Sequence, residues 1–274
     1  MQIEALEKIV VEQIAIASAF LNRYVIVDVY LPRNVDTPSE LNLLLINDGQ
    51  DLAEMNFSNL LNGLCGQIAP LICAGIHAGK DRKNEYGTAK ILDYEKRGAK
   101  AEAYHHFVMQ ELLPFLSETY HVESFAKMGF CGFSLGGLTA LNIVWSYPNV
   151  FSIVGVFSGS LWWRSKGLDD GYNEGTDRIM HQLVKEGTFH PGQRFYFTTG
   201  SLDETADRNN NGIIDSIDDT LALIAALQEK GYTENDIRYT NFEDGKHDVA
   251  TWGRAMPDFL LWAWPVAPTN TVSS

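Results

Sequence analysis

The sequence predicts an α/β protein with a mostly parallel central sheet and helices on both faces. Strand-like and helix-like segments alternate along the chain after an initial strand pair at Val10–Ala17 and Tyr24–Leu31. Parallel strands need crossover connections, usually helices, which cover the sheet on both sides. With 274 residues, 45% of them hydrophobic, the chain can bury a full-sized core. We therefore expect one domain over residues 1–264 and a loose tail at Pro265–Ser274.

The elements follow from the placement of apolar residues. Apolar runs typical of buried strands predict strands at Leu41–Asn47, Pro70–Ile76, Phe125–Cys131, Ile153–Phe157, Arg194–Thr199 and Ile237–Phe242. Helices are expected at Ala101–Tyr120, Leu138–Trp145, Asp177–Lys185, Ser216–Lys230 and Met256–Ala263. Sites in such sheets form at the carboxyl ends of strands, so the segments after these strands are the first places to look for chemistry.

Composition limits the partners and the compartment. The net charge of −14 argues against nucleic acid or an anionic membrane surface, because both favour basic patches. No apolar run approaches the length that spans a bilayer. Cys65, Cys73 and Cys131 lie in apolar surroundings without metal or redox spacing, which predicts a reducing, cytoplasmic compartment. No signal peptide is visible, and a signal peptide that was removed earlier is the alternative. The sequence leaves the oligomeric state open.

One short motif indicates nucleophilic catalysis. Gly132-Phe-Ser134-Leu-Gly136 has the form G-x-S-x-G and lies between the predicted strand Phe125–Cys131 and the predicted helix Leu138–Trp145. A sharp strand-to-helix turn of this kind holds a serine hydroxyl out above the edge of the sheet. The alternative is a simple Gly/Ser turn, but the flanking elements favour Ser134 as a nucleophile.

A serine nucleophile needs an oriented base, and behind this elbow the partners follow in the order acid, then histidine. His247 follows the last predicted strand in what reads as a flexible loop, Glu243–Asp248, whereas the other six histidines precede the acid candidates. Asp203 lies just beyond the strand Arg194–Thr199 and is the expected acid. Glu204 is the runner-up, and a more distant carboxylate such as Asp244 stays an alternative.

Two backbone N–H groups are expected to stabilise the developing oxyanion. One belongs to Leu135, directly after the nucleophile. The other is assigned to Gln50, because Asp48-Gly49-Gln50 follows the strand Leu41–Asn47 and the glycine lets the turn present the next N–H. An ordinary Asp-Gly turn is the alternative.

A second motif predicts a structural calcium ion. Oxygen-bearing side chains occupy positions 1, 3, 5, 9 and 12 of a twelve-residue loop whose sixth position is Gly212. This is the spacing of the EF-hand calcium loop, in which the seventh residue supplies a backbone carbonyl. The expected ligands are Asp207, Asn209, Asn211, Ile213, Asp215 and Asp218. The alternative is an Asn-rich surface turn. No cofactor is expected for catalysis itself.

Aromatic and charged side chains suggest the surroundings of the site. Trp162 and Trp163 follow a predicted strand end, and we expect them, with Tyr86, to line a substrate pocket, although a core role is nearly as plausible. Arg82 and Glu85 are expected to pair with each other and brace a loop, and substrate binding is the alternative.

Taken together, these segments resemble a known family. Ile46-Asn-Asp-Gly-Gln50, Gly75-Ile76 followed by Arg82-Lys-Asn-Glu-Tyr86, Gly132-Phe-Ser-Leu-Gly136 and Gly245-Lys-His-Asp248 resemble the putative esterase family, which includes esterase D-like, feruloyl and siderophore esterases and mycolyltransferases. The resemblance runs from about residue 9 to residue 262. It implies the α/β-hydrolase fold, a serine–histidine–acid mechanism, and Gln50 and Leu135 as oxyanion donors. Many members have glycine where this chain has Lys246.

The expected function is therefore a serine carboxylic-ester hydrolase that forms an acyl-enzyme on a small-molecule ester. An acyltransferase with the same triad and a non-catalytic binding module on the same fold are the alternatives. The family acts on very different acyl groups, so the resemblance names no particular ester.

Overall fold

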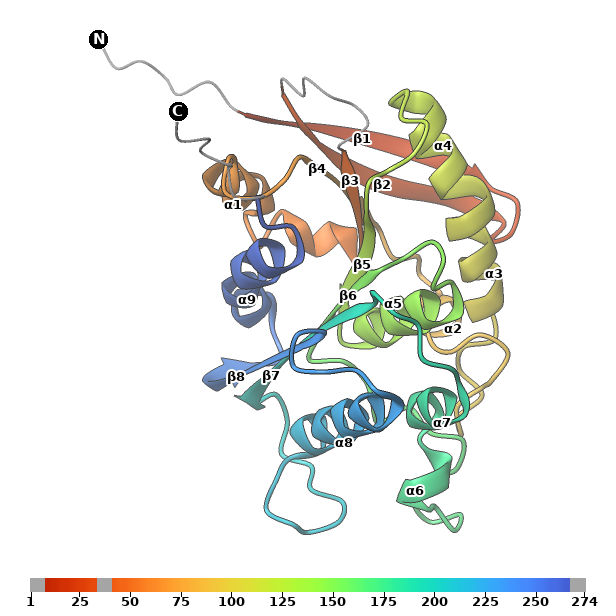
Figure 1. Cartoon of the computed structure of the whole chain (residues 1–274). Coiled ribbons are helices and arrows are strands. Elements are labelled where there is room, and N and C mark those ends of the chain that lie inside the picture. Colours follow the sequence, from red (N-terminus) through yellow and green to blue (C-terminus); the bar gives the residue numbers. More distant parts are fainter. Residues whose placement is uncertain (1–7, 34–40, 267–274) are drawn as a thin grey trace.

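The computed structural model describes residues 8–33 and 41–266, and these residues form one eight-stranded sheet with helices on both faces (Figure 1). The strand order is β1-β2-β4-β3-β5-β6-β7-β8. The strands are β1 (Ile9–Ser18), β2 (Arg23–Pro32), β3 (Asn42–Asn47), β4 (Leu71–Ile76), β5 (Met128–Phe133), β6 (Ile153–Phe157), β7 (Arg194–Leu202) and β8 (Ile237–Lys246). Only the pairings β1–β2 and β2–β4 are antiparallel. The predicted α/β-hydrolase fold is confirmed.

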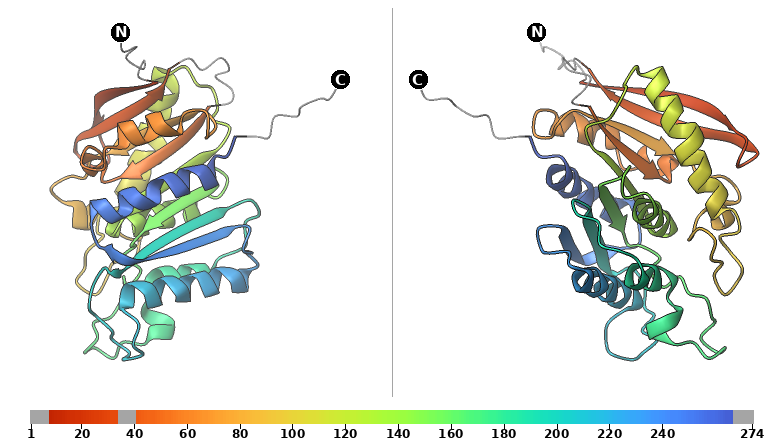
Figure 2. Two further views of the ribbon diagram at one scale, coloured as in Figure 1. Left: turned by 90° about the vertical axis from the view of Figure 1, so that its left-hand side faces the viewer. Right: turned by 45° about the vertical axis from the view of Figure 1, so that its right-hand side comes forward.

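Two groups of helices cover the two faces. The α-helices are α1 (Phe57–Leu64), α2 (Arg82–Glu85), α3 (Ala101–His106), α4 (Leu113–Thr119), α5 (Leu135–Ser146), α6 (Glu174–Asp177), α7 (Ile179–Glu186), α8 (Asp215–Lys230) and α9 (Val249–Ala263). A 3₁₀ turn, Gly49–Leu52, follows β3, and a π-helical stretch, Phe107–Leu112, joins α3 to α4. Helices α1 and α9 lie together on one side of the sheet, and α3, α4, α5, α7 and α8 lie on the other (Figures 1 and 2).

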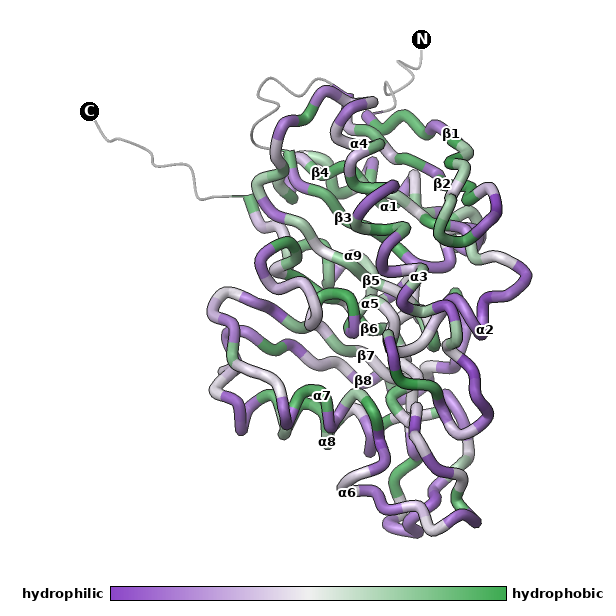
Figure 3. Tube along the Cα trace, turned by 90° about the vertical axis from the view of Figure 1, so that its right-hand side faces the viewer, coloured by the Kyte–Doolittle hydropathy of each residue, from purple (hydrophilic) through white to green (hydrophobic). Residues whose placement is uncertain are grey.

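The core is divided by the sheet. Leu43 and Leu45 of β3 belong to the cluster beneath the larger group of helices, while Leu44 and Ile46 belong to the cluster beneath α1 and α9. This alternation is what the period of two in a strand requires when both faces are covered. Hydrophobic segments accordingly concentrate on the central strands and α5, and hydrophilic ones on the outer connections (Figure 3). The polar site must therefore lie at the strand ends.

Most predicted elements occur within a few residues of their expected positions, and three differ usefully. Strand β5 begins later than predicted and runs up to Phe133, so it delivers Ser134 directly. Strand β8 extends to Lys246, which corrects the expectation of a flexible loop at Glu243–Asp248. Helix α9 begins at Val249 because the Asp248 side chain caps it by accepting a hydrogen bond from the N–H of Thr251 (2.9 Å).

The structure describes only the first residues of the predicted tail, Pro265–Ser274. Pro265 forms an isolated antiparallel bridge with Ile68, whereas residues 267–274 lie outside the described residues. Within residues 8–33 and 41–266, no helix combines the length and apolar character needed to cross a bilayer. Cys65, Cys73 and Cys131 are free thiols, and the latter two are buried.

Candidate active site

Ser134 occupies a strained turn between β5 and α5. Its backbone has φ 55° and ψ −124°, a conformation that a residue with a Cβ rarely adopts. Hydrogen bonds hold the turn on both sides: the Ser134 N–H donates to the carbonyl of Phe157 (2.9 Å), and its own carbonyl accepts from the N–H groups of Gly137 (3.0 Å) and Ser160 (3.0 Å). The Ser134 hydroxyl lies 3.4 Å from that of Ser160. Ser134 itself directly precedes the first residue of α5.

The glycines of the motif are required by close packing. A Cβ on Gly132 would lie 2.4 Å from the carbonyl oxygen of Gly136. A Cβ on Gly136 would lie 2.6 Å from a carboxylate oxygen of Asp48, which belongs to the loop after β3. The elbow is thus packed directly against that loop, and this contact places the nucleophile beside the predicted oxyanion loop.

His247 and Asp203 face each other across the ends of β8 and β7. The Nδ1 atom of His247 lies 3.9 Å from Oδ1 of Asp203, and the Asp203 side chain is fully buried, with 0% exposure. The other oxygen, Oδ2, accepts a hydrogen bond from the N–H of Gly200 (3.0 Å), whereas Oδ1 has no hydrogen-bond partner among the described residues. A buried carboxylate oxygen is costly to leave unpaired, so this geometry favours an interaction with the imidazole.

Two glycines bring these strand ends together. A Cβ on Gly200 of β7 would lie 2.4 Å from the backbone of Gly245 in β8, and the register of the two strands shifts between Gly200 and Leu202. Any side chain at either position would push the backbones apart. This long-range contact lies next to both Asp203 and His247, and neither strand alone shows it in the sequence.

The competing acids and histidines are occupied elsewhere. The Asp244 carboxylate binds the guanidinium of Arg254 through two hydrogen bonds of 3.0 Å. Glu204 is half-buried, and burial raises the pKa of its carboxyl. His105 and His181 are buried in the core, where desolvation lowers the pKa of His105 to about 4 and that of His181 to about 3.

His247 is held in a form suited to accepting a proton. Burial lowers the pKa of its imidazole, the charge of Asp203 raises it, and the positive charge of Arg82 lowers it again. A lowered pKa keeps the ring neutral near pH 7, as a general base requires. The ring packs edge-on against Trp252, with 5.3 Å between centroids.

Trp252 and Ser158 are supporting residues, a role that the sequence did not predict for them. The indole N–H of Trp252 donates to the Ser158 hydroxyl (3.1 Å), and its ring stacks on Phe133, the residue before the nucleophile. Ser158 has φ 45°, so it too lies in a strained turn at a strand end. Its position in Ser158-Gly-Ser160, directly after β6, is the signal that could have drawn attention to it.

The two predicted oxyanion donors lie at helix starts. Leu135 is the first residue of α5, so its N–H has no carbonyl within the helix to bind. Gln50 is the second residue of the 3₁₀ turn Gly49–Leu52, and Asp48 before it adopts the left-handed conformation (φ 59°). A Cβ on Gly49 would lie 2.2 Å from the backbone of Gly75, which ties this turn to β4. The oxyanion roles themselves stay predictions.

Arg82 and Glu85 do not pair with each other, which corrects that expectation. Arg82 binds Asp48 through two hydrogen bonds of 2.7 Å, and Glu85 binds Arg23 of β2 through bonds of 2.8 and 2.7 Å. Both pairs do brace loops, but to distant segments. The Arg82–Asp48 pair fixes the turn that carries Gln50.

The aromatic residues assigned to the pocket lie mostly inside the protein. Tyr86 has 0% exposure, and its hydroxyl accepts a hydrogen bond from the N–H of Asp48 (3.2 Å). Trp163 has 1% exposure. Both residues therefore pack inside the protein next to the loops around the site, and their pocket role stays a prediction. Trp162 is half-buried, and its pocket role stays a prediction.

The predicted calcium loop folds back on its first residue. The carboxylate of Asp207 accepts hydrogen bonds from the N–H groups of Asn211 (3.0 Å) and Gly212 (2.9 Å), and the Asn211 side chain accepts one from the N–H of Ile213 (2.8 Å). Asn209 donates from its side chain to Asp218 (3.0 Å). The backbone of the loop thus folds around the Asp207 carboxylate.

Its other carboxylates have protein partners. Asp215 accepts a hydrogen bond from the N–H of Arg208 (2.9 Å), and the Arg208 guanidinium also binds Asp219 and Glu174. Across the described part of the chain, no three or more His, Cys, Asp and Glu side chains form a group that could hold a metal ion. Three of the six predicted ligands are amide or carbonyl oxygens, which such a group does not include. The calcium site stays a prediction.

Comparisons with known proteins find similarity along most of the chain. A family model described as "Putative esterase" matches residues 18–263. Two proteins of Bacillus subtilis (strain 168) are similar in sequence. One, the "Uncharacterized protein YbbA", is 26% identical over 242 residues, covering 86% of this chain and 90% of that protein. The other, the "Uncharacterized protein YjcH", is 24% identical over 241 residues, covering 85% and 88%.

Several solved structures share the fold. An enterochelin esterase from Shigella flexneri has a TM-score of 0.69 at 22% identity, with 92% of this chain covered but only 57% of that protein. A ferulic acid esterase has a TM-score of 0.68 at 17% identity, covering 94% and 98%. The siderophore hydrolase EstB from Aspergillus nidulans has a TM-score of 0.68 at 17% identity, covering 97% and 99%. At these identities the likeness shows a common fold.

Proposed function

We propose that this chain, which belongs to the putative esterase family and is an ester hydrolase, cleaves carboxylic esters through Ser134, His247 and Asp203. The observation that carries the proposal is that three strand ends meet at one edge of the sheet. The strained Ser134 turn ends β5, while the buried Asp203 carboxylate and His247 face each other at the ends of β7 and β8. Serine, base and oriented acid are the parts that acyl transfer to a serine requires.

The proposed reaction proceeds in two steps. The Ser134 hydroxyl attacks the ester carbonyl and gives its proton to His247, and Asp203 stabilises the imidazolium that forms. The N–H groups of Leu135 and Gln50 stabilise the tetrahedral oxyanion. The intermediate then expels the alcohol, which takes the proton from His247 and leaves an acyl-enzyme on Ser134. A water molecule, activated by the same histidine, releases the acid.

The 3.9 Å separation of His247 and Asp203 is compatible with this role. Catalytic hydrogen bonds are often longer without substrate than in the reacting complex. His247 retains 38% side-chain exposure, so it can approach a substrate as well as Asp203.

An acyltransferase would use the same residues and pass the acyl group to an alcohol in place of water. A panel of p-nitrophenyl esters of increasing chain length, assayed with and without an added acceptor alcohol, separates the two reactions. The hydrolase proposal predicts free acid as the main product under both conditions. Predominant transfer to the alcohol would replace it with the acyltransferase.

We also propose a structural calcium ion in the loop Asp207–Asp218. The support is the twelve-residue spacing together with the way the chain folds around Asp207. The oxygens of Asp207, Asn209, Asn211 and Asp218 and the carbonyl of Ile213 would hold the ion, with Asp215 reaching it through water. The loop begins four residues after Asp203, so calcium would steady the segment that carries the acid and take no part in the chemistry.

A further inference from the structure

A basic cavity opens at the helix that carries Arg82. It has a volume of about 560 Å³ and lies between α2 with the residues just before it (Lys80–Asn84) and the loop Glu95–Arg97. We call these eight lining residues the basic pocket. Five of them are lysine or arginine and two are acidic, in a protein whose net charge is −14. This local excess of positive charge on an acidic protein favours an anionic ligand.

The pocket carries a positive charge that its own carboxylates do not balance. Its two arginines are paired: Arg82 with Asp48, and Arg97 with Asp93 and Glu95. Asp81 is paired with Lys100, which lies 2.7 Å away. The lysines at 80, 83 and 96 form no ion pair with any residue in the described ranges.

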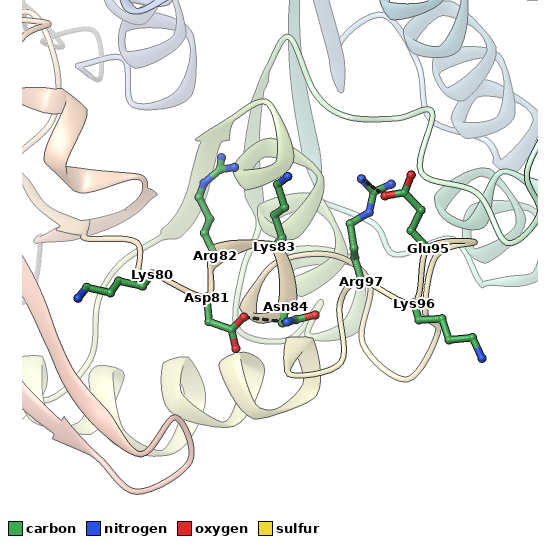
Figure 4. Close-up of a pocket in the computed structure, with 8 residues that line it drawn as sticks. All are labelled: Lys80, Asp81, Arg82, Lys83, Asn84, Glu95, Lys96 and Arg97. Atoms are coloured by element: carbon green, nitrogen blue, oxygen red, sulfur yellow. Dashed lines mark hydrogen bonds and ion pairs between the residues drawn. The ribbon is translucent and has the colours of Figure 1, made fainter.

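Lys83 is the unpaired cation whose exposed side chain lies between the two arginines. In Figure 4 the side chains of Arg82, Lys83 and Arg97 extend to the same side, with the Lys83 ammonium between the two guanidinium groups. Lys80 and Lys96 point away to the two sides (Figure 4). An anion that enters the pocket would therefore meet Lys83 first, with a guanidinium edge on either flank.

The two arginines of the pocket contact segments that surround the proposed site. Arg82 binds the Asp48 loop, which packs on the elbow at Gly136, and its positive charge lowers the pKa of His247. Arg97 lies over the rings of Trp162 and Trp163, with 5.3 Å between the guanidinium and each ring centre. These tryptophans follow Ser160, whose hydroxyl is 3.4 Å from that of Ser134.

Arg164 is a second positively charged residue near Trp162. Arg164 forms no ion pair within residues 8–33 and 41–266, and its Nε atom is buried without a hydrogen-bond partner. Its guanidinium packs on the ring of Tyr94 (4.6 Å) and near that of Trp162 (5.8 Å). Aromatic rings carry no net charge and so do not neutralise the guanidinium, and Arg164 adds to the positive potential of this side of the site.

We propose that the basic pocket binds an anionic group of the substrate, so that the enzyme prefers esters that carry a carboxylate or another anion near the scissile bond. This inference rests on the proposed ester hydrolysis and adds the charge of the substrate to it. Lys83 supplies the main contact, and Arg82 and Arg97 hold its position and contribute their outer edges. A cavity lined by one sign of charge also raises the local concentration of oppositely charged substrate.

A matched pair of substrates tests this preference. Mono-4-nitrophenyl adipate carries a terminal carboxylate, and its methyl ester is neutral with the same acyl chain. We expect kcat/KM to be higher for the anionic ester, and the ratio between the two to fall about two- to fivefold in Lys83→Gln, the upper part of the range for an exposed ion pair. The ratio should also fall in high salt, because exposed charges are then screened.

The control is Lys127→Gln. Lys127 is exposed and directly precedes β5, at the opposite end of that strand from Ser134, so its loss changes the net charge equally and should leave the ratio unchanged. An equal ratio in the parent and in Lys83→Gln, with both esters cleaved in a Ser134-dependent manner, overturns the anion preference alone. Failure of the parent to cleave either ester through Ser134 overturns the proposed function.

Discussion

Replacing Asp203 with asparagine tests the orientation and charge of the proposed base. The substitution keeps the shape of a fully buried side chain but removes the negative charge 3.9 Å from His247. At that distance, and with an effective dielectric constant of about 20, the attraction between the carboxylate and an imidazolium is about 4 kcal/mol. The exposure of His247 screens part of this, so we expect about 3 kcal/mol, or roughly two orders of magnitude in kcat.

The assay compares kcat on a p-nitrophenyl ester with the melting temperature of each variant. Two neighbouring carboxylates provide matched controls: Glu204→Gln, the alternative acid, and Asp244→Asn, which breaks only the pair with Arg254. Both should retain kcat within a few-fold. The reasoning is refuted if folded Asp203→Asn keeps near-normal kcat, and doubly so if Glu204→Gln loses it.

Two further predictions concern pH and calcium. The kcat/KM should fall as pH drops through the pKa of His247, which burial holds below 6.5. Asp203→Asn should move this fall in activity to lower pH, because the carboxylate raises the pKa of His247. Arg82→Gln should move it to higher pH, because the guanidinium lowers that pKa. Shifts in the reverse directions would contradict the assigned neighbours. Chelation with EGTA should lower the melting temperature, and calorimetry should detect calcium binding that the Asp207→Ala variant loses; an unchanged melting temperature together with no binding heat would remove calcium from the account.

The parts of the site that the sequence predicted depend on local pattern or chain order. The elbow at Ser134 is recognisable because its glycines and flanking elements are contiguous. His247 and Asp203 followed from the order in which strand ends occur. The cap of α9 at Asp248 is also local, but the prediction did not include it and began that helix at Met256, next to Pro257, which the structure accommodates within the helix.

What the sequence could not show depends on contacts between distant segments. Arg82 and Glu85 lie three residues apart, a spacing that favours a local pair on a helix, yet each binds a partner far along the chain. The contact of Gly200 with Gly245 joins two strands that are separated by α8. The basic pocket likewise appears only when the chain brings α2 beside the loop Glu95–Arg97.

The central claim is that Ser134 is the nucleophile of an acyl-enzyme mechanism. Treatment with a fluorophosphonate probe, followed by peptide mapping by mass spectrometry, tests it most directly. We predict one adduct on the peptide containing Ser134, lost in Ser134→Ala and strongly slowed in a folded His247→Gln variant. An adduct on another serine, or equal labelling of Ser134→Ala and the parent, would contradict the account.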